Sequence, residues 1–130
     1  MARKISNLIF LLCICLSVLS SCDPGSKIKY QILNKTSKPI KIKYQFPDGR
    51  PVLYVTIYPH SIKVIQLANE LGYVDGINER KDSIYFYNFE VIQGKRISTR
   101  NFKDKKYWTF SIVNRLKASY TLNIDNSFFN

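Results

Sequence analysis

The chain has 130 residues, which is enough for one domain of ordinary size. Lysine and arginine outnumber aspartate and glutamate by 20 to 9, and the resulting formal net charge of +11 favours partners with negative charge. The single histidine excludes the zinc motifs that are built on paired histidines.

A basic and then apolar stretch opens the chain. Arg3 and Lys4 precede an uncharged run of roughly 12 to 15 residues, which is typical of a secretory signal peptide. A membrane-spanning helix needs about 20 apolar residues, and Asp23-Pro24-Gly25 ends the run, so a permanent transmembrane helix is the weaker interpretation. We therefore expect residues 1–21 to be a lipoprotein signal peptide.

The end of the apolar run, Leu19-Ser20-Ser21-Cys22, resembles the bacterial lipobox, in which an aliphatic residue and two small residues precede a cysteine. Small residues let the extended chain enter a protease site, and the cysteine supplies a nucleophilic sulfur. The resemblance implies diacylglycerol on the Cys22 thiol and, with further acyl chains such as palmitate, a durable anchor. The alternative is an ordinary secretory signal in which Cys22 is coincidental.

The anchor predicts the cell envelope as the location, on a membrane surface and preferably that of the outer membrane. Residues 22–26 are then the lipidated cysteine with a short polar spacer, which holds the fold close to the headgroups. Loss of Arg3 and Lys4 lowers the net charge from +11 to +9. Because Cys13 and Cys15 leave as well, no disulfide can form, and core packing alone must stabilise residues 27–130 as a single domain.

The first two predicted strands are residues 27–32 and 40–46, which alternate apolar and polar side chains on either side of a polar turn at 34–39. Such alternation is typical of half-buried strands, with the lysines on the solvent face. A turn at 47–51 with proline and glycine follows.

The middle of the chain continues with strands at 52–58 and 62–67. The link between them, Tyr58-Pro59-His60-Ser61, is short enough to predict that the two strands pair as a hairpin. Residues 68–82 contain two glycines and scattered charges, and we expect them to form the longest loop.

The last third has one long apolar segment, residues 82–92, which is apolar on both faces and therefore predicts a central core strand. A weaker strand at 96–102, a charged loop, and strands at 107–113 and 119–124 complete the pattern. Seven or eight short strands without helical periodicity predict an all-β, Ig-like antiparallel sandwich. A small β-barrel is the alternative.

Several short motifs of this chain resemble those of the small β-sandwich lipoproteins of Bacteroidetes-type bacteria. The motifs are the lipobox, the alternating strand that begins at Ile40, the Pro59-His60-Ser61 turn, the strand opening at Asp82-Ser83-Ile84 and the terminal Ser119-Tyr120-Thr121. The resemblance extends over residues 39–124. It implies the anchor and the fold, and it adds no catalytic residue, because the function of that group is largely unassigned.

The residues do not form the pattern of an active site. His60 lies in a tight turn after Pro59, where a solvated surface side chain is the usual outcome, and no serine has a histidine and an acid arranged around it. We expect no enzyme, no cofactor, no metal site and no small-molecule substrate. A glycan hydrolase that uses two carboxylates is the remaining enzymatic alternative.

The charge gives the main functional hypothesis. Six cations surround the single acid Asp104: Lys95, Arg96, Arg100, Lys103, Lys105 and Lys106. They predict contacts with an anionic polysaccharide, a lipid headgroup or an envelope protein, whereas nucleic acid is not expected at this location. The alternative is that these cations, like those of the predicted strands, are a solvated face that protects strand edges.

Two further hypotheses concern sugars. Five tyrosines would stack on sugar rings if they faced outward, although tyrosines at alternate strand positions usually belong to the core: Tyr54, Tyr58, Tyr85, Tyr87 and Tyr107. Asp82-Ser83-Ile84 resembles the acceptor motif of Bacteroidetes O-glycosylation, which implies a glycan on Ser83. The sequence thus predicts a lipid-anchored, non-enzymatic envelope protein that binds or scaffolds, with anionic glycan or lipid as the favoured partner and a structural subunit of an envelope complex as the alternative.

Overall fold

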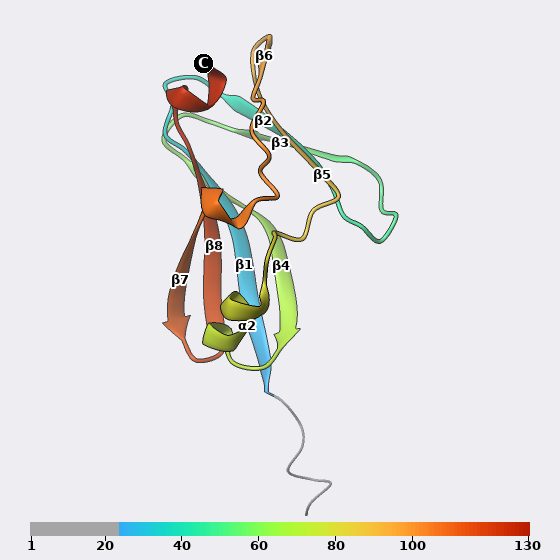
Figure 1. Ribbon diagram of the computed structural model, residues 1–130. Coiled ribbons are helices and arrows are strands. Elements are labelled where there is room, and N and C mark those ends of the chain that lie inside the picture. Colours follow the sequence, from blue (N-terminus) through green and yellow to red (C-terminus); the bar gives the residue numbers. More distant parts are fainter. Residues whose placement is uncertain (1–23) are drawn as a thin grey trace, which may run out of the picture.

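A computed structural model describes residues 24–130, so the predicted signal peptide, the lipobox and Cys22 lie outside the described residues. Eight strands form two four-stranded sheets, which confirms the predicted all-β sandwich (Figure 1). The strands are β1 (Gly25–Asn34), β2 (Ile40–Gln45), β3 (Leu53–Ile57), β4 (Ile62–Leu71), β5 (Asn88–Gln93), β6 (Arg96–Ile97), β7 (Trp108–Asn114) and β8 (Lys117–Ile124). One α-helix, α2 (Val74–Arg80), and two short 3₁₀ helices, η1 (Lys105–Tyr107) and η2 (Asn126–Phe129), complete the fold.

Sheet A has the strand order β4-β1-β8-β7. The first and last strands, β1 and β8, lie side by side at its centre and run parallel, whereas every other pairing in the two sheets is antiparallel. The predicted alternation holds in β1, where Ile28, Tyr30 and Ile32 are buried and Lys27 and Lys29 are exposed.

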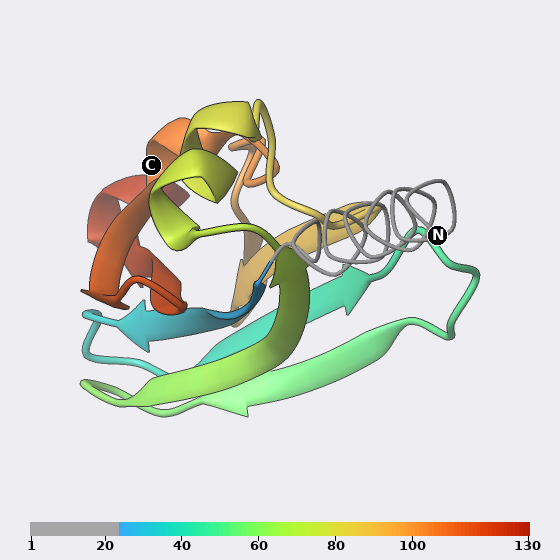
Figure 2. The same ribbon diagram turned by 90° about the horizontal axis from the view of Figure 1, so that it is seen from below.

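Sheet B has the order β3-β2-β5-β6 and packs over the end of sheet A where β1 ends (Figure 1). The other end of sheet A is covered by α2, as the view from below shows (Figure 2). Val74 and Ile77 of this helix are buried in the same core cluster as the strands. The core is therefore closed by a second sheet at one end and by a short helix at the other.

The predicted hairpin between the third and fourth strands is wrong, because β3 belongs to sheet B and β4 to sheet A. Asn34 explains the change of sheet. Its backbone carbonyl accepts from the His60 N–H (2.8 Å), and its own N–H donates to the Ser61 carbonyl (3.0 Å), so the link is tied to the end of β1. His60 has a positive φ of 56° at this point.

The Asn34 side chain is buried and fully paired, and it joins three segments. Its amide nitrogen donates to the Lys38 carbonyl (2.9 Å) and to the Ile57 carbonyl (3.0 Å). Its amide oxygen accepts from the backbone N–H (2.9 Å) and from the hydroxyl (2.8 Å) of Thr36. This network fixes the point at which the chain leaves sheet A and later returns to it.

The segment predicted as the longest loop is instead the end of a strand and a helix. Strand β4 continues to Leu71, Gly72 turns the chain with a φ of 98°, and α2 follows. The C-terminal end of α2 is closed by Lys105, whose ammonium donates to the carbonyls of Asn78 (2.5 Å) and Lys81 (3.3 Å). A cation at this position stabilises the unpaired carbonyls of the last helical turn.

The predicted core strand at 82–92 is shorter than expected, since β5 begins only at Asn88. Before it, Ile84 and Phe86 are buried and Tyr85 and Tyr87 are exposed, so the side chains alternate without regular pairing. The segment is held by single contacts, among them the Ile84 N–H to the Lys103 carbonyl (2.9 Å). The weaker strand predicted at 96–102 is likewise reduced to the two residues of β6.

Candidate functional site

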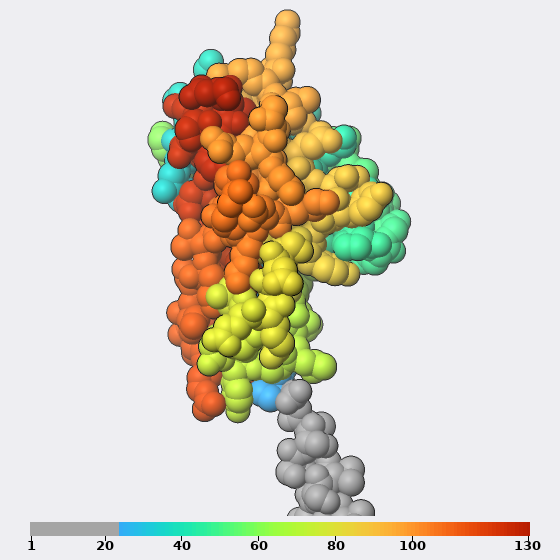
Figure 3. Space-filling view, in the orientation of Figure 1, coloured from blue at the N-terminus to red at the C-terminus, as the bar shows by residue number. Residues whose placement is uncertain are grey.

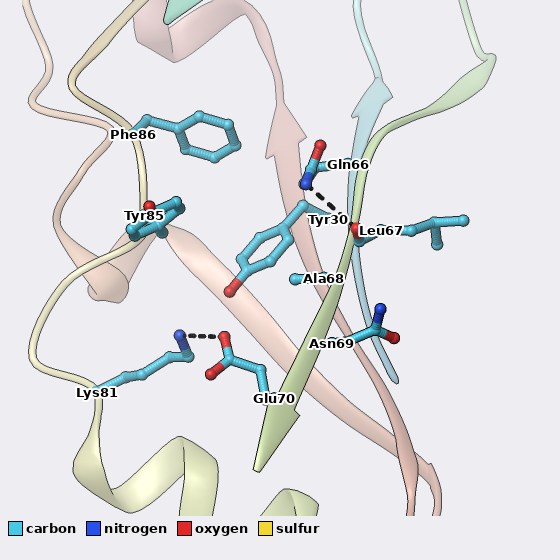
Figure 4. Close-up of a pocket in the computed structure, with 9 residues that line it drawn as sticks. All are labelled: Tyr30, Gln66, Leu67, Ala68, Asn69, Glu70, Lys81, Tyr85 and Phe86. Atoms are coloured by element: carbon cyan, nitrogen blue, oxygen red, sulfur yellow. Dashed lines mark hydrogen bonds and ion pairs between the residues drawn. The ribbon is translucent and has the colours of Figure 1, made fainter. Parts of the chain in front are cut away.

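A cavity of about 480 Å³ lies between β4 and the chain that follows α2. It lies where sheet B no longer covers sheet A, and Lys81, Tyr85 and Phe86 from the chain after α2 form the opposite wall (Figures 1 and 4). Its lining residues are Tyr30, Gln66, Leu67, Ala68, Asn69, Glu70, Lys81, Tyr85 and Phe86.

Tyr30 is the unusual residue of this cavity. Its side chain is only 2% exposed, and its hydroxyl has no hydrogen-bond partner among residues 24–130. In Figure 4 the hydroxyl points toward the space between Tyr85 and Glu70. Burial, with a smaller effect from the Glu70 charge, raises the pKa of Tyr30 well above its usual range, so the phenol stays protonated and can donate a hydrogen bond.

A charged pair stands opposite the phenol. The Lys81 ammonium lies 2.7 Å from the Glu70 carboxylate, and both side chains are more than two-thirds buried. Glu70 is the last but one residue of β4, and Lys81 is the residue directly after α2. Since each charge retains free hydrogen-bonding positions besides the other, the pair offers both a donor and an acceptor to a ligand.

Aromatic rings form the remaining wall. Phe86 is buried and meets the Tyr30 ring edge to face at 5.9 Å, whereas Tyr85 is 53% exposed at the rim. The cavity therefore combines an accessible aromatic ring with a phenol, a carboxylate, an ammonium and the amides of Gln66 and Asn69. This combination suits a small ligand that is rich in hydroxyl groups and has one apolar face, as a sugar ring does.

The cavity carries one carboxylate, Glu70, and two further hollows on the described surface carry one each, Glu90 and Asp104. The turn acids predicted to be solvated lie elsewhere. Asp48 accepts from Arg50 (2.7 Å), and Asp104 lies 2.9 Å from Lys106. Among residues 24–130, no three His, Cys, Asp or Glu side chains gather as a metal site would require, and His60 stands alone in its exposed turn.

The structure divides the predicted basic segment instead of presenting it as one surface. Lys105 is turned inward to α2, and Lys106 pairs with Asp104. Arg100 lies over the rings of Tyr107 (5.9 Å) and Phe128 (5.3 Å). Lys103 is exposed beside a different hollow. These four cations therefore do not converge on a common ligand position.

The other two cations of the segment lie near lysines from an earlier part of the chain. Lys95 and Arg96 line a hollow of about 500 Å³ together with Lys38. It adjoins a second hollow, of about 510 Å³, on the outer face of sheet B, which is lined by Lys41, Lys43 and Tyr54. We call this surface the basic face of sheet B and define it by Lys38, Lys41, Lys43, Lys95 and Arg96. Its acidic member is Glu90, 3.1 Å from Lys43.

Of the five tyrosines proposed as sugar contacts, four are exposed, and they are distributed over different parts of the surface: Tyr54, Tyr58, Tyr85 and Tyr87. Tyr107 is half-buried against Phe102 and Phe128. Only Tyr85 lines the cavity. Ser83, the predicted glycan acceptor, is exposed and lies next to Asp104 in an isolated bridge.

Most of the cavity could not be predicted from the sequence, because Tyr30, Glu70 and Lys81 come from three separate segments and share no motif. One signal was present. Tyr30 takes an inward position between Ile28 and Ile32, where an aliphatic residue would be expected and where a phenol needs a partner.

No helix in the part of the chain described here is both long and apolar enough to cross a membrane. Comparison of the chain with protein-family models, with curated proteins and with solved structures finds no match.

Proposed function

We propose that this protein is a lipid-anchored, non-enzymatic binding protein of the bacterial cell envelope, and that its cavity holds a hydroxyl-rich unit of an envelope glycan. The observation that carries the proposal is the buried Tyr30 hydroxyl, which points into the cavity without a partner in the described chain. An unpaired buried hydroxyl costs about 1–3 kcal/mol, and a ligand that accepts its hydrogen bond removes this cost.

The surrounding groups support a sugar over an apolar ligand. Glu70 accepts from hydroxyl groups, Lys81 donates to them, and the exposed ring of Tyr85 provides a stacking surface. A purely apolar ligand would leave the phenol and the charged pair unpaired. The two-carboxylate hydrolase finds no support at this site, since Glu70 is the one carboxylate that lines the cavity.

Titration of the purified protein with fragments of envelope polysaccharide, followed by calorimetry, tests the proposal. We expect Tyr85→Ala to weaken binding about 2- to 12-fold, because a stacking contact contributes about 0.5–1.5 kcal/mol. The matched control is Tyr87→Ala, which removes an equally exposed tyrosine that does not line the cavity. Equal losses in both variants, or binding that neither variant changes, would refute the cavity as the site.

The anchor is tested separately. Replacing Cys22 with Ser removes the sulfur on which the acyl group would be placed. In cells fed a fatty-acid analogue, we expect the wild-type protein to be labelled and membrane-bound and the variant to be neither. A variant that is still labelled would show that the acyl group is attached elsewhere.

A second candidate ligand, an anionic glycan chain, is favoured by the basic face of sheet B. This face has five cations and one acid, and the exposed Tyr54 is the register partner of Lys43. Binding of this kind falls steeply with salt. Replacing Lys38, Lys41, Lys95 and Arg96 by Ser should abolish it, while the same change at four exposed cations elsewhere should not: Lys35, Lys63, Lys103 and Lys106. Equal losses would mean that only net charge matters.

A further inference from the structure

One end of the molecule gathers the start of β1, the end of β4 and the turn between β7 and β8 (Figures 1 and 3). Backbone contacts hold these segments together. Gly25 pairs with Leu71, the Gly72 N–H donates to the Pro24 carbonyl (2.8 Å), and the Lys27 N–H donates to the Leu116 carbonyl (2.8 Å). We call this surface the β1-start end.

Large apolar side chains are exposed at this end. Leu71 is 71% exposed and Val113 is 73% exposed, and Leu116 and Tyr73 stand beside them with more than a third of their surface in solvent. Single exposed apolar residues are ordinary, but several on neighbouring turns at one end of a domain mark a contact surface.

Cations surround these apolar residues. Lys27 and Lys117 are register partners in β1 and β8, and the Arg115 guanidinium lies 4.2 Å from the centre of the Tyr73 ring. Lys27, Lys29 and Lys117 also line a hollow of about 260 Å³, together with Leu67 and Val113. Two acids lie close to this end, Asp75 in the first turn of α2 and Glu70 in β4, and Lys81 pairs with Glu70. Apolar side chains within a ring of cations match a bilayer with anionic headgroups.

We propose that the β1-start end docks onto an anionic lipid surface, with Leu71, Val113 and Leu116 in the interfacial layer and Lys27, Arg115 and Lys117 against lipid phosphates. The proposal rests on the anchor at Cys22, and the length of chain to that residue supports it. Three residue steps separate Cys22 from Gly25, and an extended chain covers at most about 10 Å in that number of steps. The end that carries Gly25 therefore has to lie close to the headgroups, and its surface matches them.

The test uses the mature lipoprotein in vesicles. Acylation occupies Cys22, and Cys13 and Cys15 are removed with the signal peptide, so Leu116→Cys introduces the one thiol that can be labelled. A fluorophore at this position is observed in vesicles whose lipids carry a nitroxide quencher just below the headgroups. The matched control carries the fluorophore at Ser37→Cys, in the exposed turn that follows the other end of β1.

We expect strong quenching at position 116 and none at position 37, and only when the vesicles contain anionic lipid. Changing Lys27, Arg115 and Lys117 together to Gln should lower the docking equilibrium about 100-fold, whereas the same change at Lys35, Lys63 and Lys103 should leave it intact. Quenching that is independent of anionic lipid or of the three cations would overturn the electrostatic part of the proposal.

Two failures can be told apart. Protein that does not remain with any vesicle refutes the anchor at Cys22, and the docking with it. Protein that remains with the vesicles while the probe at position 116 stays unquenched refutes the docking alone and leaves this end for a protein partner. Equal quenching at positions 116 and 37 also refutes it, because the domain then has no fixed orientation.

Discussion

Replacing Tyr30 with Phe removes the hydroxyl that has no partner in the described chain and keeps the ring that packs in the core. The Tyr30 ring is stacked on Tyr120 at 5.4 Å and meets Phe86 and Trp108 edge to face, and Phe preserves all three contacts. The variant loses only the desolvation cost of an unpaired hydroxyl, about 1–3 kcal/mol. We expect a gain of about 1 kcal/mol in the free energy of unfolding, which raises Tm by roughly 4–8 °C for a domain of this size.

Tyr120→Phe is the matched control, because it makes the same change in the neighbouring ring. The Tyr120 hydroxyl donates to the Asn78 side chain (2.9 Å), so its loss leaves a polar group unpaired and should lower stability by about 1 kcal/mol. Urea unfolding followed by circular dichroism measures both variants. Opposite signs support the argument, and destabilisation of Tyr30→Phe would show that the Tyr30 hydroxyl has a partner. In the glycan titration, Tyr30→Phe should bind about 5- to 10-fold more weakly.

Three further predictions concern stability. Lys105→Ala should lower the free energy of unfolding in urea by about 1 kcal/mol, because it removes the donor to the C-terminal carbonyls of α2. The control Lys103→Ala should change this free energy by less than about 0.5 kcal/mol. Similar values for the two variants would contradict the assigned role of Lys105. Asn34→Ala should cost about 3 kcal/mol or more, since four hydrogen bonds of a buried side chain are lost, and a loss below about 1 kcal/mol would refute the network. Burial, and to a smaller extent the charge of the neighbouring Tyr30, raises the pKa of Tyr120 from 10.0 to about 12. The unfolded chain releases this proton at a lower pH than the folded protein does. The contribution of Tyr120 to stability should therefore be complete below pH 10 and be lost as the pH rises through 12. Ultraviolet absorbance should show tyrosine ionising together with unfolding, and full ionisation of the folded protein at pH 11 would contradict the assignment.

The strands that follow from local pattern were predicted well. In β1 and β2 every second residue faces the core, and a period of two residues is visible over any six residues of sequence. Partner choice was not predictable in the same way. The link before β4 is short, yet its N–H and C=O groups pair with Asn34, and no local rule shows that a distant asparagine competes with the neighbouring strand.

The helix was missed for a related reason. Seven residues give only two apolar positions, Val74 and Ile77, and Gly76 between them lowers the helical propensity. What stabilises α2 is tertiary, namely the core under it and the Lys105 ammonium at its end. Lys105 also illustrates why the basic segment was overestimated as a surface, since a lysine in a charged run looks the same in sequence whether it is solvated or caps a helix.

The parallel pairing of β1 with β8 determines when the domain can fold. Gln31 of β1 donates to Thr121 of β8 across 90 residues of sequence. A chain that crosses a membrane from its N-terminus therefore delivers one half of the central pair first and the other half last. Until β8 arrives, β1 can pair only with β4, so the centre of sheet A stays incomplete and its apolar face is prone to aggregate. If the chain is exported as proposed, it depends on the chaperones of its compartment for as long as export takes, and a stop codon that removes only the final strand leaves the centre of sheet A unformed.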